Sequence, residues 1–70
     1  MNEFSLKGRD FIALNDLLKI VGLCGSGGAA KILIAKGNVK VDGQIELRKT
    51  CKIRSGQVVE HAREKITVTP

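Results

Sequence analysis

A glycine-rich segment at residues 22–28 carries the clearest binding chemistry of this chain of 70 residues. Ser26 has the side chain of a helix N-cap, and Gly27 and Gly28 follow it where a helix would begin. The first N–H groups of a helix lack partners inside the helix, so such a start can bind phosphate oxygens. The segment therefore predicts a phosphate-binding surface. By itself it leaves open whether the phosphates belong to RNA, DNA or a small ligand.

The positive charge of the chain is concentrated in its middle third. The net charge is +5, and residues 31–54 hold seven cations against two anions, a surplus of five, while the remaining residues hold five of each. A surplus confined to one part indicates a polyanionic partner. A general solubility role is the alternative. The seven cations are Lys31, Lys36, Lys40, Arg48, Lys49, Lys52 and Arg54.

Residues suited to catalysis or metal binding are few and scattered. His61 is the only histidine, and Cys24 and Cys51 lack zinc-ligand spacing. The pattern Gly25-x-Gly27-x-x-Ala30 matches a dinucleotide fingerprint formally, but a helix is expected before it, where the fingerprint needs a strand. No nucleophile with a neighbouring base can be assembled. We expect a protein that is not an enzyme, with no catalytic residue, no metal site and no cofactor.

Aromatic side chains are scarce. Phe4 and Phe11 are the only two, and both are expected in the core. Proteins that bind single-stranded bases use exposed aromatic rings as stacking platforms. Recognition by shape and by phosphate contacts is therefore favoured over the reading of splayed bases.

Hydrophobic periodicity predicts two helices. Apolar residues at positions 14, 17, 18 and 21 recur at helical spacing, and Gly22 is a typical helix stop. Phe11, Ile12 and Ile20 are expected to widen that apolar face. A second helix is predicted over residues 27–36, capped by Ser26. Its predicted core stripe is Ala30, Leu33 and Ile34, with Ala29 and Ile32 beside it, and its outer side holds Gly28, Lys31 and Ala35.

Short strands are predicted on either side of the helices. Residues 4–6 alternate, and Asp42-Gly43 is a hairpin signal between the alternating segments 39–41 and 45–47. If residues 48–54 are extended, Arg48, Thr50, Lys52 and Arg54 share one face. Further strands are expected at 58–59 and 66–68. The predicted fold class is α+β: a short N-terminal strand, two packed helices, then a small antiparallel β-sheet, in one domain over residues 1–70.

An ordered set of residues resembles the ribosomal-protein-S-four-type RNA-binding domain, also called the alpha-L motif. The resemblance covers about residues 11–60 and is closest to the small stand-alone bacterial YbcJ-like proteins. One departure is Gly27, which stands where many members of the family have a basic residue. The matching residues are Leu14-x-x-Leu17-Leu18, Gly22, Ser26, Ala30-Lys31, Ile34, Gly37-x-Val39-x-Val41-Asp42-Gly43 and Ser55-Gly56-Gln57-x-Val59.

The resemblance implies binding to structured RNA, usually ribosomal or transfer RNA, on a surface formed by the two helices and the following hairpin. Ser26, Lys31, Gly37, Lys40 and Asp42-Gly43 match motif positions. Lys31 and Lys40 are the main predicted phosphate contacts. The full predicted RNA-binding set is Ser26, Gly27, Gly28, Lys31, Lys36, Lys40, Arg48, Lys49, Lys52 and Arg54.

Two other functions stay open. A protein-interaction adaptor would dock its helix pair on a ribosome-associated or enzyme surface. DNA binding is weaker, because the second helix is short, apolar and poor in base-reading side chains. No apolar run approaches the roughly 20 residues that span a bilayer, and no secretory signal is evident. We expect a monomeric cytoplasmic protein with no membrane partner, and with a ribosome or protein partner as a further possibility.

Overall fold

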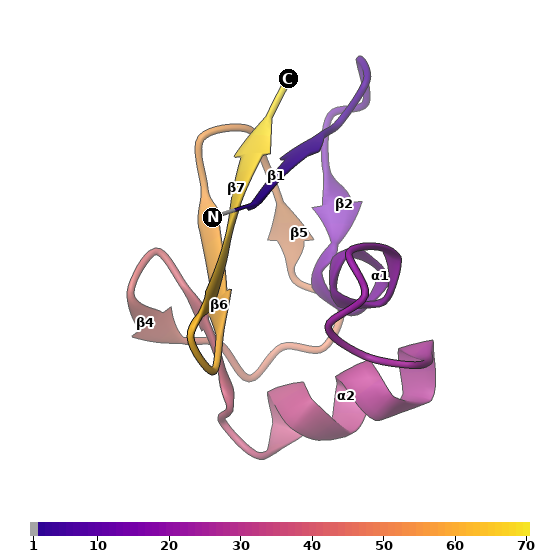
Figure 1. Cartoon of the computed structure of the whole chain (residues 1–70), viewed down its shortest axis with the longest axis vertical. Helices are drawn as coiled ribbons and strands as arrows, with labels where there is room; N and C mark the ends of the chain where they lie inside the picture. The colour runs from indigo at the N-terminus through magenta and orange to yellow at the C-terminus, as the bar shows by residue number, and fades with distance from the viewer. Residues whose placement is uncertain (1) are drawn as a thin grey trace.

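The computed structural model describes residues 2–70, in which two helices pack against one face of a five-stranded sheet (Figure 1). A second sheet of two strands closes the core on another side. The α+β class is therefore confirmed. The elements are β1 (Asn2–Ser5), β2 (Ile12–Ala13), α1 (Leu14–Ile20), α2 (Gly27–Ala35), β3 (Val39–Val41), β4 (Gln44–Ile45), β5 (Lys52–Ile53), β6 (Val58–His61) and β7 (Glu64–Thr69).

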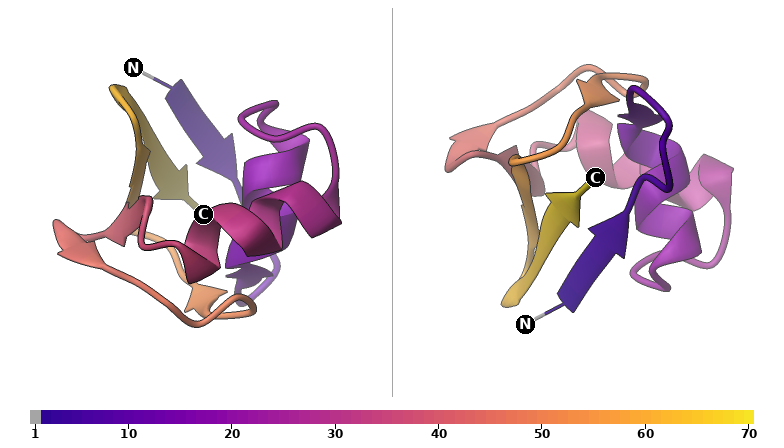
Figure 2. Two further views of the ribbon diagram at one scale, coloured as in Figure 1. Left: turned by 90° about the horizontal axis from the view of Figure 1, so that it is seen from below. Right: turned by 90° about the horizontal axis from the view of Figure 1, so that it is seen from above.

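The larger sheet has the order β1-β7-β6-β3-β4, and it is mixed. The strands after the helices pair antiparallel, as expected, while β1 runs parallel to β7, with Phe4 opposite Val68, a pairing that the sequence did not predict. Figure 2 shows the first and last strands side by side. Parallel strands need a long connection, and here nearly the whole domain lies between them. The pairing brings Phe4 against the buried core.

The segment between the two sheets is not extended throughout, so the condition for residues 48–54 to share one strand face is not met. β4 ends at Ile45, and a turn closed by the Cys51 N–H and the Arg48 carbonyl, 3.2 Å apart, precedes β5. Ala13, at the N-cap position of α1, makes no side-chain capping bond. Instead the loop supplies carbonyl groups to the N–H groups at the start of that helix, which lack partners inside it. The loop therefore contacts the start of α1 and does not continue β4 as a strand.

The helix ends follow the sequence signals. In α2 the Ser26 Oγ accepts a hydrogen bond from the Ala29 N–H at 3.1 Å, as expected of an N-cap. Gly22 follows α1 with a φ of +84°, a conformation that glycine adopts at little cost. Asp42 and Gly43 have φ values of +52° and +83°, the mark of the tight hairpin turn predicted there.

The core lies between α1, α2 and the inner faces of both sheets. Ala30 and Ile34 of α2 are fully buried and Leu33 is half-buried, as predicted. Phe11 and Ile20 are wrongly predicted, because they are 38% and 57% exposed, and Ile32 is 58% exposed. The buried apolar residues are Leu6, Ile12, Leu14, Leu17, Leu18, Ala30, Ile34, Val39, Val41, Ile53, Val59, Ile66 and Val68.

Neither helix within residues 2–70 is long and apolar enough to pass through a bilayer.

Candidate functional site

A turn at residues 48–51 is fixed to the start of α1. The carbonyl of Cys51 accepts a hydrogen bond from the Leu14 N–H at 2.9 Å, and the carbonyl of Lys49 accepts one from the Asn15 N–H at 3.1 Å. Leu14 is fully buried, so these bonds tie the turn to the core. The cations of this turn therefore project from an anchored backbone.

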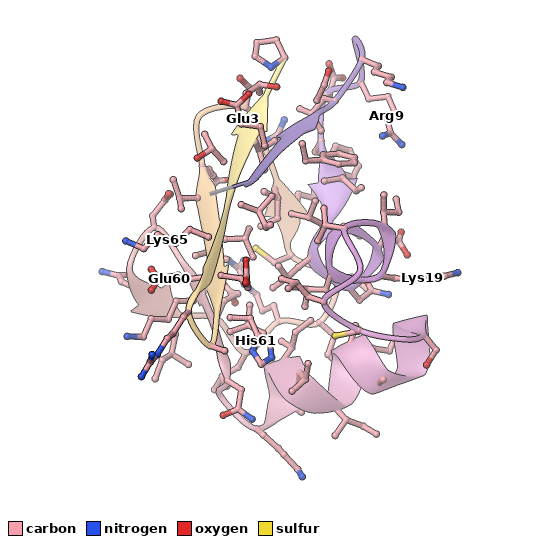
Figure 3. The ribbon with its side chains drawn as sticks, in the orientation of Figure 1. Glu3, Arg9, Lys19, Glu60, His61 and Lys65 are labelled. Carbon is pink, nitrogen blue, oxygen red and sulfur yellow. The ribbon has the colours of Figure 1, made fainter. Side chains whose placement is uncertain are left out.

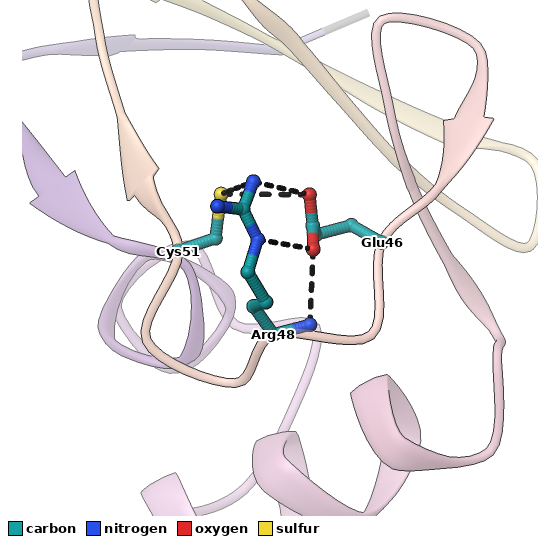
Figure 4. Close-up of polar contacts among 3 residues, drawn as sticks. All are labelled: Glu46, Arg48 and Cys51. Carbon is teal, nitrogen blue, oxygen red and sulfur yellow. Dashed lines mark hydrogen bonds and ion pairs between the residues drawn. The ribbon is translucent and has the colours of Figure 1, made fainter.

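Arg48 is held by an acidic neighbour two residues earlier (Figure 4). Its Nε–H and one Nη2–H donate to the two carboxylate oxygens of Glu46 at 2.9 and 3.0 Å, and its backbone N–H donates to Oε2 at 3.0 Å. These bonds from Arg48 lower the pKa of Glu46 from 4.5 to about 2. Burial, with the negative charge of Glu46, raises the pKa of Cys51, so its thiol stays protonated and donates to Oε1 at 3.6 Å.

Lys52 and Arg54 are gathered by an aromatic ring. Ile12 pairs with Ile53 facing the core, so Phe11 and the two cations lie on the opposite face of the small sheet. The Lys52 Nζ lies 5.0 Å from the centroid of the Phe11 ring, and the Arg54 Cζ lies 5.7 Å from it. Such contacts attract a cation to the ring face. Phe11 thus holds the two charges near each other.

The start of α2 presents unbonded backbone donors. The N–H groups of Gly27 and Gly28 have no protein partner within residues 2–70, and the first turn contains no acid. The Asn15 Nδ2 lies 3.9 Å from the point where a Cβ on Gly27 would stand. Since the Asn15 N–H also binds the carbonyl of Lys49, Asn15 joins the start of α2 to the 48–51 turn. Lys31 lies one helical turn after Gly27 and so projects on the same side.

Asn15 also stands out for its burial. The residue is 8% exposed, and its Oδ1 is buried without a hydrogen-bond partner among the described residues. A buried polar atom left unpaired costs roughly 1–3 kcal/mol, so the junction between these two regions is not optimised for stability alone.

We group these segments as one candidate surface, which we call the basic face. Acids also adjoin its five cations, among them Glu46, which is bonded to Arg48, Asp16, which follows Asn15, and Asp10, which precedes Phe11. The surface therefore keeps an excess of positive charge. The basic face consists of the N–H groups of Gly27 and Gly28 and the side chains of Lys31, Arg48, Lys49, Lys52 and Arg54.

Two predicted contact residues lie apart from this surface. Lys40 sits between the buried Val39 and Val41 on β3, so its side chain leaves the sheet on the face away from the helices. It lies opposite Glu60 of β6, which lies opposite Lys65 of β7. Figure 3 shows Glu60 and Lys65 on the side of the sheet away from α1. The other residue is Lys36, which is exposed at the C-terminal end of α2.

An open depression of about 360 Å³ lies beside the 48–51 turn. Arg48, Thr50, Cys51 and Lys52 line it. The sequence predicted that Arg48, Thr50 and Lys52 share a face of an extended strand; the structure brings them together through a turn instead. Glu46 was not among the predicted site residues, although its spacing of two from Arg48 was the available signal.

The described residues contain no cluster of three or more histidine, cysteine, aspartate or glutamate side chains that would suit a metal ion. His61 instead bonds through Nδ1 to the Asn38 carbonyl at 3.0 Å. Cys24 and Cys51 are free thiols, each half-buried.

Comparisons with known proteins agree with this architecture. A family model described as the S4 domain matches residues 4–69. The chain is 50% identical over 68 residues to the "Putative RNA-binding protein YbcJ" of Escherichia coli (strain K12), covering 97% of each chain, and equally to a YbcJ protein of Shigella flexneri described as uncharacterized. The solution structure of the Escherichia coli YbcJ protein matches with a TM-score of 0.78 at 48% identity, covering 100% of this chain and 89% of that one. That structure is described as revealing an alpha-L motif involved in RNA binding.

Proposed function

This chain belongs to the S4 domain family, and from that premise we propose that it is a non-catalytic protein that binds structured RNA. Ribosomal or transfer RNA is the expected class of target. The Escherichia coli YbcJ protein supports the same proposal, because its name and the description of its solution structure both mention RNA binding. We expect the protein to act as a monomer in the cytoplasm.

The observation that carries the proposal is the composition of the basic face. The start of α2, with its free N–H donors, adjoins the 48–51 turn through Asn15, and five cations lie on or near these two segments. Phosphate oxygens are bound by such N–H groups and by Lys and Arg side chains. A run of phosphates on a folded RNA strand would meet several of these donors at once.

The single exposed aromatic of the described residues favours phosphate contacts over base stacking. Phe11 is 38% exposed, but Lys52 and Arg54 lie against its ring. A covered ring offers a poor platform for a nucleotide base. RNA with a defined backbone shape is therefore the expected ligand, in preference to an unstructured strand.

The test is a mobility-shift titration of the purified protein against ribosomal RNA fragments, transfer RNA, an unstructured single strand and duplex DNA. With about four to six phosphate contacts, the logarithm of affinity should fall with the logarithm of salt concentration at a slope of roughly −3 to −5. Folded RNA should bind more tightly than the other two classes. Affinity that does not respond to salt would contradict the proposal.

A second candidate function rests on exposed apolar side chains near the end of α2. Ile45 and Leu47 are each 59% exposed, and both approach Gly37, within 3.6 and 3.9 Å of the position of a Cβ there. An exposed apolar cluster of this kind is found at protein interfaces. An adaptor role would be favoured if a ribosomal or enzyme partner stayed bound after nuclease treatment and at high salt.

A further inference from the structure

Glu46 is an acid placed inside a basic surface. A carboxylate there lowers the positive potential that attracts RNA, so the charge of Glu46 would by itself weaken RNA binding. Its side chain is 18% exposed, and it accepts three bonds from Arg48, one of them from the backbone. An arginine bound by two parallel N–H bonds has a fixed plane. Glu46 therefore fixes the direction in which Arg48 presents its remaining donors.

Arg48 keeps donors free after this pairing. An arginine carries five N–H groups, and here Nε and Nη2 are engaged by Glu46 and by the Cys51 Sγ. Within residues 2–70 the Nη1 group has no partner, and the side chain is 76% exposed. Two N–H groups thus remain for an external acceptor, with their orientation already set.

The depression beside this arginine has the other groups that a phosphate needs. Arg48, Thr50 and Lys52 all line it, and their side chains end in a guanidinium, a hydroxyl and an amine. The three residues offer two positive charges and one neutral donor, and the turn that carries them is bonded to the buried start of α1. The backbone of the turn and the side chain of Arg48 are already held in place before binding, and this favours affinity.

We propose that this depression is a subsite for a single phosphate group, and that Glu46 is the residue that positions Arg48 to bind it. The inference rests on the proposed function, since the phosphate is one of a bound RNA. It assigns contacts to Arg48, Thr50 and Lys52 and an indirect role to Glu46.

The positioning role and a purely electrostatic role predict opposite signs. The variant Glu46→Gln raises the net charge by one, so an electrostatic role alone would make RNA bind more tightly. If Glu46 positions Arg48, the same variant weakens binding, because the amide replaces one acceptor with a donor that faces the guanidinium. We expect about a three- to tenfold weaker affinity for transfer RNA or a ribosomal RNA fragment, at the same salt concentration. The matched control is Glu64→Gln, on the far strand β7, which we expect to leave affinity unchanged or slightly higher.

A double-mutant cycle separates positioning from a general loss of stability. In the background of Arg48→Gln, the change Glu46→Gln should no longer weaken binding, because the residue through which it acts is gone. A loss of the same size in both backgrounds would overturn the positioning role. Thr50→Val removes the third donor at almost constant volume and should weaken binding by about threefold, with unchanged thermal unfolding. Wild-type affinity in this variant would remove Thr50 from the subsite.

Inorganic phosphate provides a test without RNA. Titrated at constant ionic strength, it should shift the NMR signals of the Thr50 amide and the Arg48 Nε–H more than those of Lys40 or Lys65. Equal small shifts at all exposed lysines would overturn the subsite. If Glu46→Gln binds as tightly as wild type while RNA binding stays salt-sensitive, this inference fails alone. If the wild-type protein shows no salt-sensitive RNA binding, the proposed function fails with it.

Discussion

The basic face and the outer face of the five-stranded sheet both carry lysines, but they surround them differently. On the sheet, Lys40 lies opposite Glu60, and Glu60 lies opposite Lys65, so charges alternate from strand to strand. On the basic face, five cations outnumber the acids beside them, and one of these acids, Glu46, is bonded to Arg48. The first arrangement pairs charge across a sheet, and the second gathers charge on one side of the molecule.

The difference teaches that the neighbours of a cation decide what it can bind. A carboxylate opposite a lysine partly cancels the positive potential of that lysine. Lysines beside free backbone N–H groups add to one positive potential instead. Both surfaces are exposed, so burial does not distinguish them. The comparison therefore favours the basic face over the outer face of the sheet as the surface that we propose for RNA binding.

Charge reversal on each face should give the largest difference in RNA affinity between the two faces. Lys52→Glu with Arg54→Glu and Lys40→Glu with Lys65→Glu both lower the net charge from +5 by four. We expect the first pair to weaken RNA binding roughly 100-fold, taking about 1.5 kcal/mol for each lost charged contact. The second pair should change affinity by less than about threefold, because screening weakens charges beyond about 10 Å. Equal losses from both pairs, measured by fluorescence anisotropy, would leave only net charge as the cause.

Adding a cation sharpens the comparison in the opposite direction. Gly27 has room for a side chain, with Asn15 Nδ2 at 3.9 Å as its nearest neighbour. We expect Gly27→Arg to tighten RNA binding up to about tenfold, since one added charged contact is worth about 1.5 kcal/mol. The control Glu60→Gln raises the net charge equally on the sheet face and should leave affinity within about twofold. If Glu60→Gln proved the stronger of the two, the RNA surface would have to be moved to the sheet.

The caps of the basic face can be tested through stability. Ser26→Ala removes the bond to the Ala29 N–H and should destabilise the fold by about 1 kcal/mol, which lowers the Tm by roughly 4–8 °C in a domain of this size. Ser55→Ala changes an exposed turn residue that makes no side-chain hydrogen bond in the described chain, and should change the free energy of unfolding by less than about 0.5 kcal/mol. Thermal denaturation of both variants would show whether the start of α2 depends on its cap.

The smallest expected effect is a loss of folding stability at acid pH. The pKa of Glu46 falls from 4.5 to about 2 in the folded protein, because Arg48 donates to its charged form. Its contribution to stability is therefore complete above pH 4.5 and is lost as the pH falls toward 2. Because Arg48 is exposed, the loss should be modest. Melting curves of Glu46→Gln should respond less to acid over this interval than those of wild type, while Glu64→Gln should keep the wild-type response.

Features set by neighbours in the chain could be predicted from the sequence. The Ser26 cap, the Gly22 stop and the Asp42-Gly43 turn each depend on a few residues, and their side chains carry the signal. The same holds for the concentration of charge in residues 31–54. These local signals were enough for the fold class and for most of the candidate site.

Features set by distant pairing could not be predicted. The parallel pairing of β1 with β7 joins residues 64 apart, such as Phe4 and Val68, and no local pattern reports it. Because Phe11 is apolar, the sequence predicts it in the core. The pairing of β2 with β5 instead directs its ring outward, under Lys52 and Arg54. Similarly, Glu46 counted in the sequence as one more anion. Its role depends on the turn that brings Arg48 back to it.

The most direct test of the central claim is an NMR titration of the labelled protein with a folded RNA, following every backbone amide. The account predicts the largest shifts at Gly27, Gly28, Lys49, Thr50 and Lys52. It predicts small shifts at Lys40, Glu60 and Lys65, although these residues are also charged and lie at the surface. Shifts centred on β3, β6 and β7, with the start of α2 and the 48–51 turn unchanged, would contradict it.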